Sequence, residues 1–111
     1  MIAVIFEVTP KAEGKSLYFE MAQALKSTLN QIDGFISIER FQSLSNPNTF
    51  LSLSFWQNEI AVIQWKENLE HQIAQKKGKE ELFSHFRIRV GNVIRDYGSE
   101  TQVSEYRQEV K

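Results

Sequence analysis

Residues 50–71 read FLSLSFWQNEIAVIQWKENLEH. In the first seven residues leucine alternates with serine between aromatic ends, which is typical of a β-strand. A short polar segment follows, in which Asn58 has the side chain preferred at the N-cap of a helix. Apolar residues then recur four positions apart at Ala61, Trp65 and Leu69, as on one side of a helix. The stretch therefore predicts a strand that leads directly into a helix.

Similar patterns on either side complete the order β-α-β-β-α-β. We expect strands at residues 2–8, 35–44, 50–56 and 84–97, and helices at residues 16–31 and 57–78. Asn46-Pro47-Asn48 predicts a hairpin loop between the second and third strands, and Asp33-Gly34 predicts the end of the first helix. This order indicates an α+β fold of the ferredoxin-like type, with an antiparallel sheet.

The composition narrows the classes of function. The chain has 111 residues, which indicates a single domain, and its formal net charge of −1 gives no bulk attraction to nucleic acid or to anionic membranes. It has no cysteine, which excludes disulfides, thiolate catalysis and cysteine-ligated metals. No apolar run approaches the ~18 residues of a membrane span, and residues 1–6 lack the basic start of a signal peptide. We therefore expect a cytoplasmic protein.

The first strand carries apolar residues on both faces. Ile2, Val4 and Phe6 share one face, while Ala3 and Ile5 share the other. Two helices cover one face of a ferredoxin-like sheet, so the second face needs another cover. Burying apolar surface is worth about 25 cal/mol per Å². The pattern therefore predicts a homodimer whose sheets pack together.

Several short segments carry a family resemblance. They are GFISIERF at residues 34–41, LSLSFW at 51–56, Ala61-Val62 through Trp65, Glu70-His71, Ala74-Gln75, Gly78, and FRIRV at 86–90. Together they resemble the antibiotic biosynthesis monooxygenase (ABM) family of dimeric α/β barrels. The resemblance covers residues 1–97 as an ABM-like domain and leaves residues 98–111 as a polar tail. It implies a homodimer in which each subunit has a cavity between its sheet and its helices.

Two chemistries are associated with this superfamily. One is the cofactor-independent oxygenation of phenols and hydroquinones to quinones, and the other is haem binding and degradation. Trp65 matches the cavity tryptophan of both enzyme classes. The haem enzymes also have an asparagine on the first strand and a histidine about three turns beyond the tryptophan. Here residues 2–8 contain no asparagine and Gln75 occupies the second position, so the resemblance implies no cofactor, with haem as the alternative.

His71 lies close to the position of a polar ring residue in the phenol oxygenases. An unperturbed histidine has a pKa near 6.5, so it can accept a proton from a phenol. The resemblance thus implies that His71 is the general base and that Trp65 stacks on the substrate ring. The competing interpretations are a histidine on the helix surface beside Glu70, and a tryptophan that only packs in the core.

Further residues complete the expected cavity. The resemblance and the strand ends place Phe55, Trp56, Tyr18 and Met21 in its wall. The charged residues inside the strands are Glu7, Glu39, Arg40, Arg87 and Arg89. Such residues are tolerated in a covered sheet when they pair, lie at an interface or face a wet cavity. We expect salt bridges for most of them, and Arg87 is the expected anion-stabilising residue of the cavity.

Two other motifs lack the patterns of known metal and phosphate sites. His85 has no partners at metal-ligand spacing, so no metal site is expected. The Lys76-Lys77-Gly78-Lys79 cluster lacks the glycine-rich frame of a phosphate-binding loop and indicates a solvated turn.

The function that these observations predict is cofactor-independent monooxygenation of a small aromatic phenol or quinol. Two alternatives from other classes stay open. One is a non-catalytic module that holds a small hydrophobic ligand or haem, and the other is a structural dimer whose cavity is filled by its own side chains.

Overall fold

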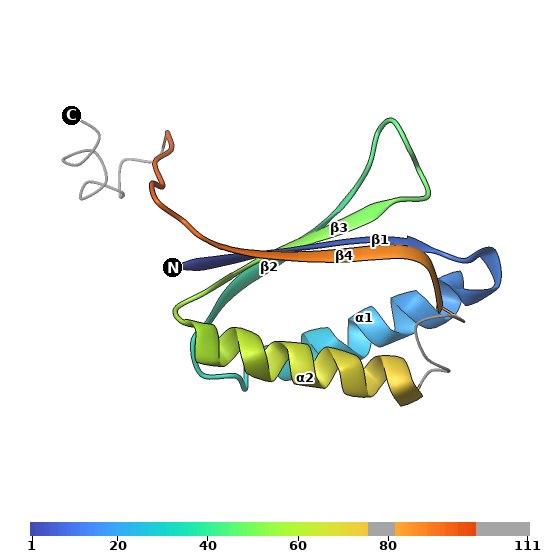
Figure 1. The fold of residues 1–111 in the computed structure, drawn as a ribbon, viewed down its shortest axis with the longest axis horizontal. Coiled ribbons are helices and arrows are strands. Elements are labelled where there is room, and N and C mark those ends of the chain that lie inside the picture. Colours follow the sequence, from blue (N-terminus) through green and yellow to red (C-terminus); the bar gives the residue numbers. More distant parts are fainter. Residues whose placement is uncertain (76–81, 100–111) are drawn as a thin grey trace.

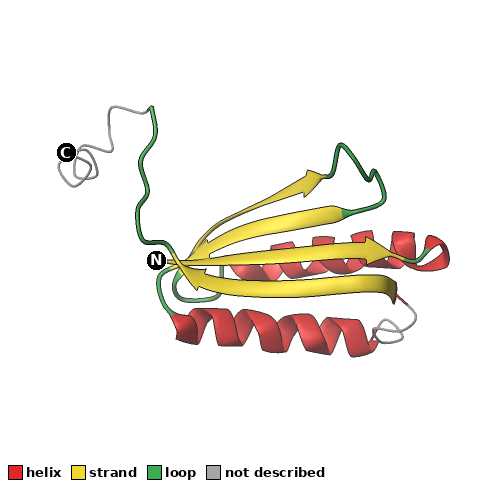
Figure 2. Ribbon diagram, turned by 45° about the horizontal axis from the view of Figure 1, so that its top comes forward, coloured by secondary structure: helices red, strands yellow, loops and turns green. Residues whose placement is uncertain are grey.

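An antiparallel sheet carries both helices on the same face (Figures 1 and 2). The computed structural model describes residues 1–75 and 82–99, in which four strands have the order β2-β3-β1-β4. The elements are β1 (Ile2–Pro10), the 3₁₀ turn η1 (Ala12–Gly14), α1 (Lys15–Leu29), β2 (Phe35–Gln42), β3 (Phe50–Trp56), α2 (Glu59–Gln75) and β4 (Phe83–Asn92). This is the ferredoxin-like α+β fold that the sequence predicted.

Two strands are shorter than predicted, and the pairing explains both differences. β2 ends at Gln42 instead of residue 44 because its partner β3 begins at Phe50, opposite Gln42. β4 ends at Asn92 instead of residue 97 because its partner β1 begins at Ile2. One more backbone bond follows, from the N–H of Val93 to the carbonyl of Met1 at 3.0 Å, and then β1 has no residue left to pair.

The helices also begin and end close to their predicted limits. α1 spans Lys15–Leu29, against the predicted 16–31, and α2 spans Glu59–Gln75, against 57–78. The Lys76–Lys79 cluster lies outside the described residues, as does the predicted tail from residue 100 onward. Neither described helix has the length and apolarity that a bilayer crossing requires.

The helix-covered face of the sheet forms the core. Even-numbered residues of β1 and β3 are buried beneath the helices, because side chains alternate across a strand. Trp56 is fully buried, and its indole N–H donates a 2.9 Å hydrogen bond to the Ser54 hydroxyl. This bond satisfies a polar group that would otherwise be left unpaired in an apolar environment.

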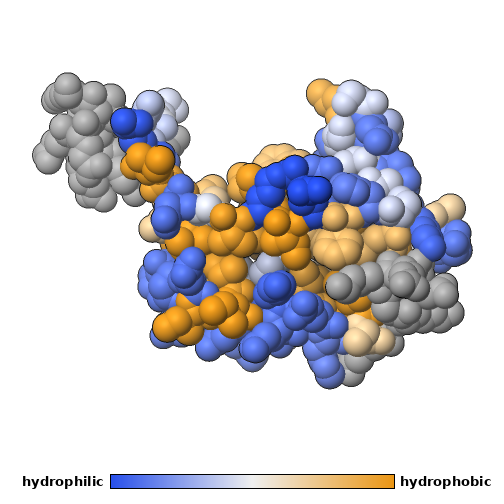
Figure 3. Space-filling view, in the orientation of Figure 1, coloured by the Kyte–Doolittle hydropathy of each residue, from blue (hydrophilic) through white to orange (hydrophobic). Residues whose placement is uncertain are grey.

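The opposite face, which we call the open face, is not covered by any described segment (Figure 1). Odd-numbered residues of β1 and β3 point to it, as do those of β2 from Ser37 and of β4 from His85. Register shifts at the ends of β2 and β4 turn Phe35 and Phe83 to the core instead. The centre of the open face is apolar, with Ile5, Leu51, Leu53 and Phe55 half-buried. In Figure 3 apolar side chains also form a band along the β4 side of the sheet and a patch over the first turns of α2.

The charged residues of the open face surround Glu7. Its carboxylate lies 3.5 Å from Nε2 of His85 and 3.5 Å from a guanidinium nitrogen of Arg89. Register places Arg87 directly opposite Glu7, and Glu39 lies on the same face. The predicted salt bridges across the sheet are therefore confirmed for Glu7 and Arg89.

A tight junction fixes the start of α2. Gly34 has a φ of +99°, and its carbonyl accepts a 2.8 Å bond from the N–H of Gln57. A Cβ at position 34 would lie 3.1 Å from the Cβ of Ala61. The Asn58 side-chain oxygen accepts a 2.9 Å bond from the Ala61 N–H, so the predicted N-cap is confirmed.

Asn58→Ala should lower the free energy of unfolding by about 1 kcal/mol, because the capping hydrogen bond is lost. Urea denaturation followed by circular dichroism measures this change. Asn68→Ala is the matched control, since Asn68 is exposed within α2 and caps nothing. An equal effect of the two substitutions would contradict the capping role.

Candidate functional site

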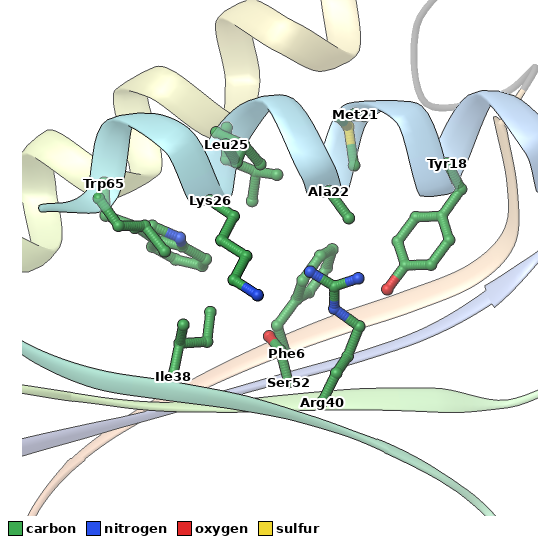
Figure 4. Close-up of a pocket in the computed structure, with 12 residues that line it drawn as sticks. Phe6, Tyr18, Met21, Ala22, Leu25, Lys26, Ile38, Arg40, Ser52 and Trp65 are labelled. Carbon is green, nitrogen blue, oxygen red and sulfur yellow. The ribbon is translucent and has the colours of Figure 1, made fainter.

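A small cavity lies between α1, α2 and the helix-covered face of the sheet (Figure 4). Its lining residues are Phe6, Tyr18, Met21, Ala22, Leu25, Lys26, Leu29, Ile38, Arg40, Ser52, Trp65 and Leu69. The space between these side chains is about 30 Å³, and the whole hollow measures about 400 Å³ when open solvent is counted. The enclosed part has room for about one or two water molecules.

Aromatic and aliphatic side chains form the inner wall of the cavity. Trp65 of α2 is 3% exposed, and its ring meets that of Phe6 edge to face, with 6.3 Å between centroids. Trp56 packs behind Trp65, also at 6.3 Å between centroids. Met21 of α1 is buried in the same wall. This wall offers an edge and a face on which an apolar ring can pack.

Four polar side chains converge on the cavity from the other side. Figure 4 shows the Lys26 ammonium, the Arg40 guanidinium and the Tyr18 hydroxyl directed toward the same space, with Ser52 beneath them. None of the four side chains makes a hydrogen bond or an ion pair with another part of the described chain. They are thus donors with unused capacity at a hollow that is otherwise apolar.

Strand register explains why Arg40 reaches the cavity. Arg40 lies opposite Ser52 in the β2–β3 ladder, and Ser52 is on the buried, even-numbered side of β3. Directly opposed residues point to the same face of a sheet. β2 is an edge strand, so the long side chain of Arg40 extends from the rim toward α1, where Lys26 lies.

Tyr18 is the ionisable group most affected by this environment. Only 2% of Tyr18 is exposed, and burial raises the pKa of its hydroxyl above the ordinary value of 10.0, while the positive charge of Arg40 acts in the opposite direction. Tyr18 is therefore protonated at neutral pH. It can donate a hydrogen bond to an oxygen atom in the cavity.

The structure brings together three of the residues proposed from the sequence. Trp65, Tyr18 and Met21 all line the cavity. Trp56 does not line it, because it is fully enclosed behind Trp65. Phe55 does not line it either, because its odd-numbered position on β3 directs it to the open face.

His71 and Arg87 also lie away from the cavity lining. The buried positions at the end of α2 are Leu69 and Ile73, and His71 lies on the exposed side between them. Arg87 pairs in register with Glu7 on the open face. The expectation that these two side chains line the cavity was wrong, because His71 lies on the exposed side of α2 and Arg87 lies on the open face of the sheet. Their roles in a reaction stay predictions.

Several lining residues were not singled out from the sequence, among them Phe6, Lys26 and Ser52, and Arg40 was not preferred to Arg87. One signal for Arg40 was present: it shares parity with Ile38, the apolar residue of β2 that packs against the core. Lys26 had no comparable signal, since a lysine beside an apolar helix stripe is usually solvated.

The donors around the cavity do not match a metal or haem site. No group of three histidine, cysteine, aspartate or glutamate side chains comes together within residues 1–75 and 82–99. In that part of the chain no histidine lines the cavity. The enclosed 30 Å³ is also far smaller than a haem macrocycle. The residues present therefore do not fit the haem alternative.

The raised pKa of Tyr18 makes stability pH-dependent in alkali. Above about pH 10 the unfolded chain loses the tyrosine proton while the folded chain keeps it, so the free energy of unfolding falls as pH rises. Tyr18→Phe should reduce this fall, measured by urea denaturation at about pH 9 and about pH 11. The control is Tyr97→Phe at an exposed tyrosine. An unchanged pH profile in Tyr18→Phe would contradict the assignment.

Known proteins share this fold and sequence pattern. A curated relative from Pyricularia oryzae, named jasmonate monooxygenase ABM, is 41% identical over 93 residues, which cover 84% of this chain and 43% of that protein. The chain thus spans less than half the length of this relative. The structure of Rv0793 from Mycobacterium tuberculosis has a TM-score of 0.74 at 17% identity, covering 87% of this chain and 98% of that one.

A second solved structure is that of SnoaB, a cofactor-independent oxygenase from Streptomyces nogalater. It matches with a TM-score of 0.68 at 10% identity, covering 88% of this chain and 97% of that one. At these identities the two structures establish the shared fold. The model of the family described as antibiotic biosynthesis monooxygenase matches residues 1–77, which is most of the chain. This protein is therefore a member of the antibiotic biosynthesis monooxygenase family.

Proposed function

We propose that this protein is a cofactor-independent monooxygenase that acts on a small aromatic phenol or quinol. The observation that carries the proposal is the cavity: an aromatic wall of Trp65 and Phe6 faces the Tyr18 hydroxyl and two cationic side chains. The family membership supports an oxygenase. So do the names of two similar proteins, one a jasmonate monooxygenase and the other a cofactor-independent oxygenase.

The proposed reaction needs no external reductant. A phenol and one O₂ give a quinone and one water: a ring C–H bond and the phenolic O–H bond break, one oxygen atom forms the new C=O, and the other leaves as water. The ring supplies all four electrons that reduce O₂. The first electron leaves most readily from the phenolate, so the protein must favour loss of the phenolic proton.

The cavity has groups suited to this task. Positive charge near a phenol favours its ionised form, and Arg40 and Lys26 bring two such charges to the mouth. Trp65 packs on the ring and Tyr18 donates to an oxygen substituent. His71 is the base predicted from the family resemblance, and its exposed position leaves water at the mouth as the competing proton acceptor.

The small enclosed volume favours a second candidate, a dimer whose cavity is filled by its own side chains. Sites for small molecules usually measure about 300 Å³ or more, and the enclosed space here is about 30 Å³. A substrate ring can enter only if side chains at the mouth move. Lys26 and Arg40 are exposed and flexible, and Met21 is unbranched, so these are the residues that would give way.

Oxygen consumption tests the proposal directly. In buffer treated with a metal chelator, the protein should consume one O₂ per hydroquinone, and ¹⁸O₂ should place one labelled atom in the product. Trp65→Leu should lower kcat/KM about tenfold, because packing against an aromatic ring is lost. Tyr97→Leu is the control at an exposed aromatic residue. Consumption no faster than with heat-denatured protein would favour the filled dimer.

His71→Gln tests the predicted base separately, since glutamine has a similar size and no basicity. Loss of a general base lowers kcat by about 10²–10⁴-fold. The pH dependence of kcat should also change in the variant. An unchanged kcat and pH profile would mean that solvent, and not His71, accepts the phenolic proton.

We also propose that the open face is the interface of a homodimer. Its apolar centre of Ile5, Leu51, Leu53 and Phe55 is half-exposed, and Phe41 beside it is 45% exposed. Polar and charged residues surround this centre, as in many protein interfaces. A second copy would bury the same residues in its own sheet.

Leu53→Asp should convert the dimer to a monomer, because it places an unpaired charge at the centre of the interface. Light scattering coupled to size exclusion should then give about 12.9 kDa for the variant and twice that mass for the original protein. Leu44→Asp is the control, since Leu44 is fully exposed in the hairpin loop. A monomeric mass for the original protein would refute the dimer.

A further inference from the structure

The two cations at the cavity mouth point to a substrate more specific than a neutral phenol. We propose that the substrate carries a carboxylate next to its oxidised ring, and that Arg40 and Lys26 bind this carboxylate. The inference rests on the proposed function and adds the substrate class. In this arrangement Arg40 and Lys26 bind the carboxylate, and the wall formed by Trp65 packs against the ring.

The position of the charges supports this assignment. Arg40 and Lys26 line the inner cavity, and together with Ile38 they also line a neighbouring depression of about 260 Å³. They therefore stand at the boundary between an apolar interior and a more open, polar space. A ligand that fits this boundary has an apolar ring on one side and an anionic group at the rim. Arginine can bind a carboxylate through two parallel hydrogen bonds.

The charge of the outer depression is positive even when Glu39, the acid that lines it, is included. Glu39 lines the outer depression with the two cations, but it forms no ion pair with either of them. Register places Glu39 opposite Leu53, on the side of β2 that faces away from the helices. Both cations thus keep their charge available for a ligand, whereas Arg89 on the open face is paired with Glu7.

Two hydroxyls at the cavity identify the other end of the ligand. Tyr18 is almost fully buried, yet its hydroxyl points into the cavity and makes no hydrogen bond within the described residues (Figure 4). Ser52 is also buried, and its hydroxyl is equally unpaired there. Among the described residues no buried side-chain nitrogen or oxygen lacks a partner, so both hydroxyls are within reach of water in the cavity. A ligand that displaces this water is favoured when it hydrogen-bonds to them. Two hydroxyl groups on the ring of a quinol would supply the required oxygen atoms.

A matched pair of probes tests the inference without turnover. The probes are 2,5-dihydroxybenzoate, a quinol with a carboxylate, and 2,5-dihydroxybenzamide, its neutral counterpart. Binding of each is measured by titration calorimetry under anaerobic conditions, so the result does not depend on whether the protein is an oxygenase. We expect the carboxylate to bind roughly five- to tenfold more tightly, with a preference that declines as salt is added.

Variants locate the source of this preference. Arg40→Gln and Lys26→Gln should each bring the affinities for the two probes to within about twofold of each other, mainly by weakening the binding of 2,5-dihydroxybenzoate. The matched controls are Arg95→Gln and Lys66→Gln, at exposed positions outside the cavity lining, and they should keep the preference. Circular dichroism and thermal melting confirm that each variant is folded.

Three outcomes overturn the inference. They are equal binding of the two probes, no detectable binding of either, and a preference that survives both cavity variants. Turnover of hydroquinone combined with equal binding would refute the carboxylate assignment and leave the oxygenase intact. A clear preference without oxygen consumption would refute the oxygenase and retain the anion site.

Discussion

The alternation of side chains across β1 and β3 is the constraint on which the rest of the structure depends. These two strands occupy the centre of the sheet, so each of their residues belongs either to the helix-covered core or to the open face. A shift of one residue in either strand would exchange Phe6 with Glu7 or Ser52 with Leu53. The cavity and the open face are therefore two consequences of one register.

The same register determines on which face of the sheet each charged residue of the strands lies. Glu7, Arg87 and Arg89 lie on the open face, where solvent or a second subunit can compensate their charge. Arg40 has the opposite parity and lies on an edge strand, where its stem packs beside α1 and its guanidinium stays in contact with water. An arginine at this position is tolerated because the edge strand avoids the full penalty of burying a charge.

The interior of the site is arranged around aromatic packing. Trp56 holds Trp65 from behind, and Phe6 meets Trp65 from the side, so the indole of α2 has little freedom to rotate. The opposite wall is more adaptable, since it contains the two long cationic side chains of Lys26 and Arg40. A rigid wall facing an adaptable one is consistent with a ligand that enters from the side of α1.

Much of this architecture follows from the sequence by itself. The periods of the apolar residues determined the four strands, the two helices and the ferredoxin-like order, and Asn58 marked the start of α2 correctly. The cavity itself was expected only from the family resemblance, and Trp65, Tyr18 and Met21 are the residues proposed for it that lie on the buried sides of their helices. The spacing of apolar residues within one helix or strand is sufficient to predict which side of that element is buried.

Only the tertiary structure decided which arginine reaches the cavity and which histidine does not. The parity of Arg40 and of Arg87 can each be read along its own strand, but which parity meets the helices depends on pairing between strands far apart in sequence. His71 is excluded from the lining by the rotation of α2 on the sheet, which the packing of Trp65 and Leu69 sets. The strand ends at Gln42 and Asn92 are likewise determined by where the neighbouring strand begins, because a ladder needs a partner at every step.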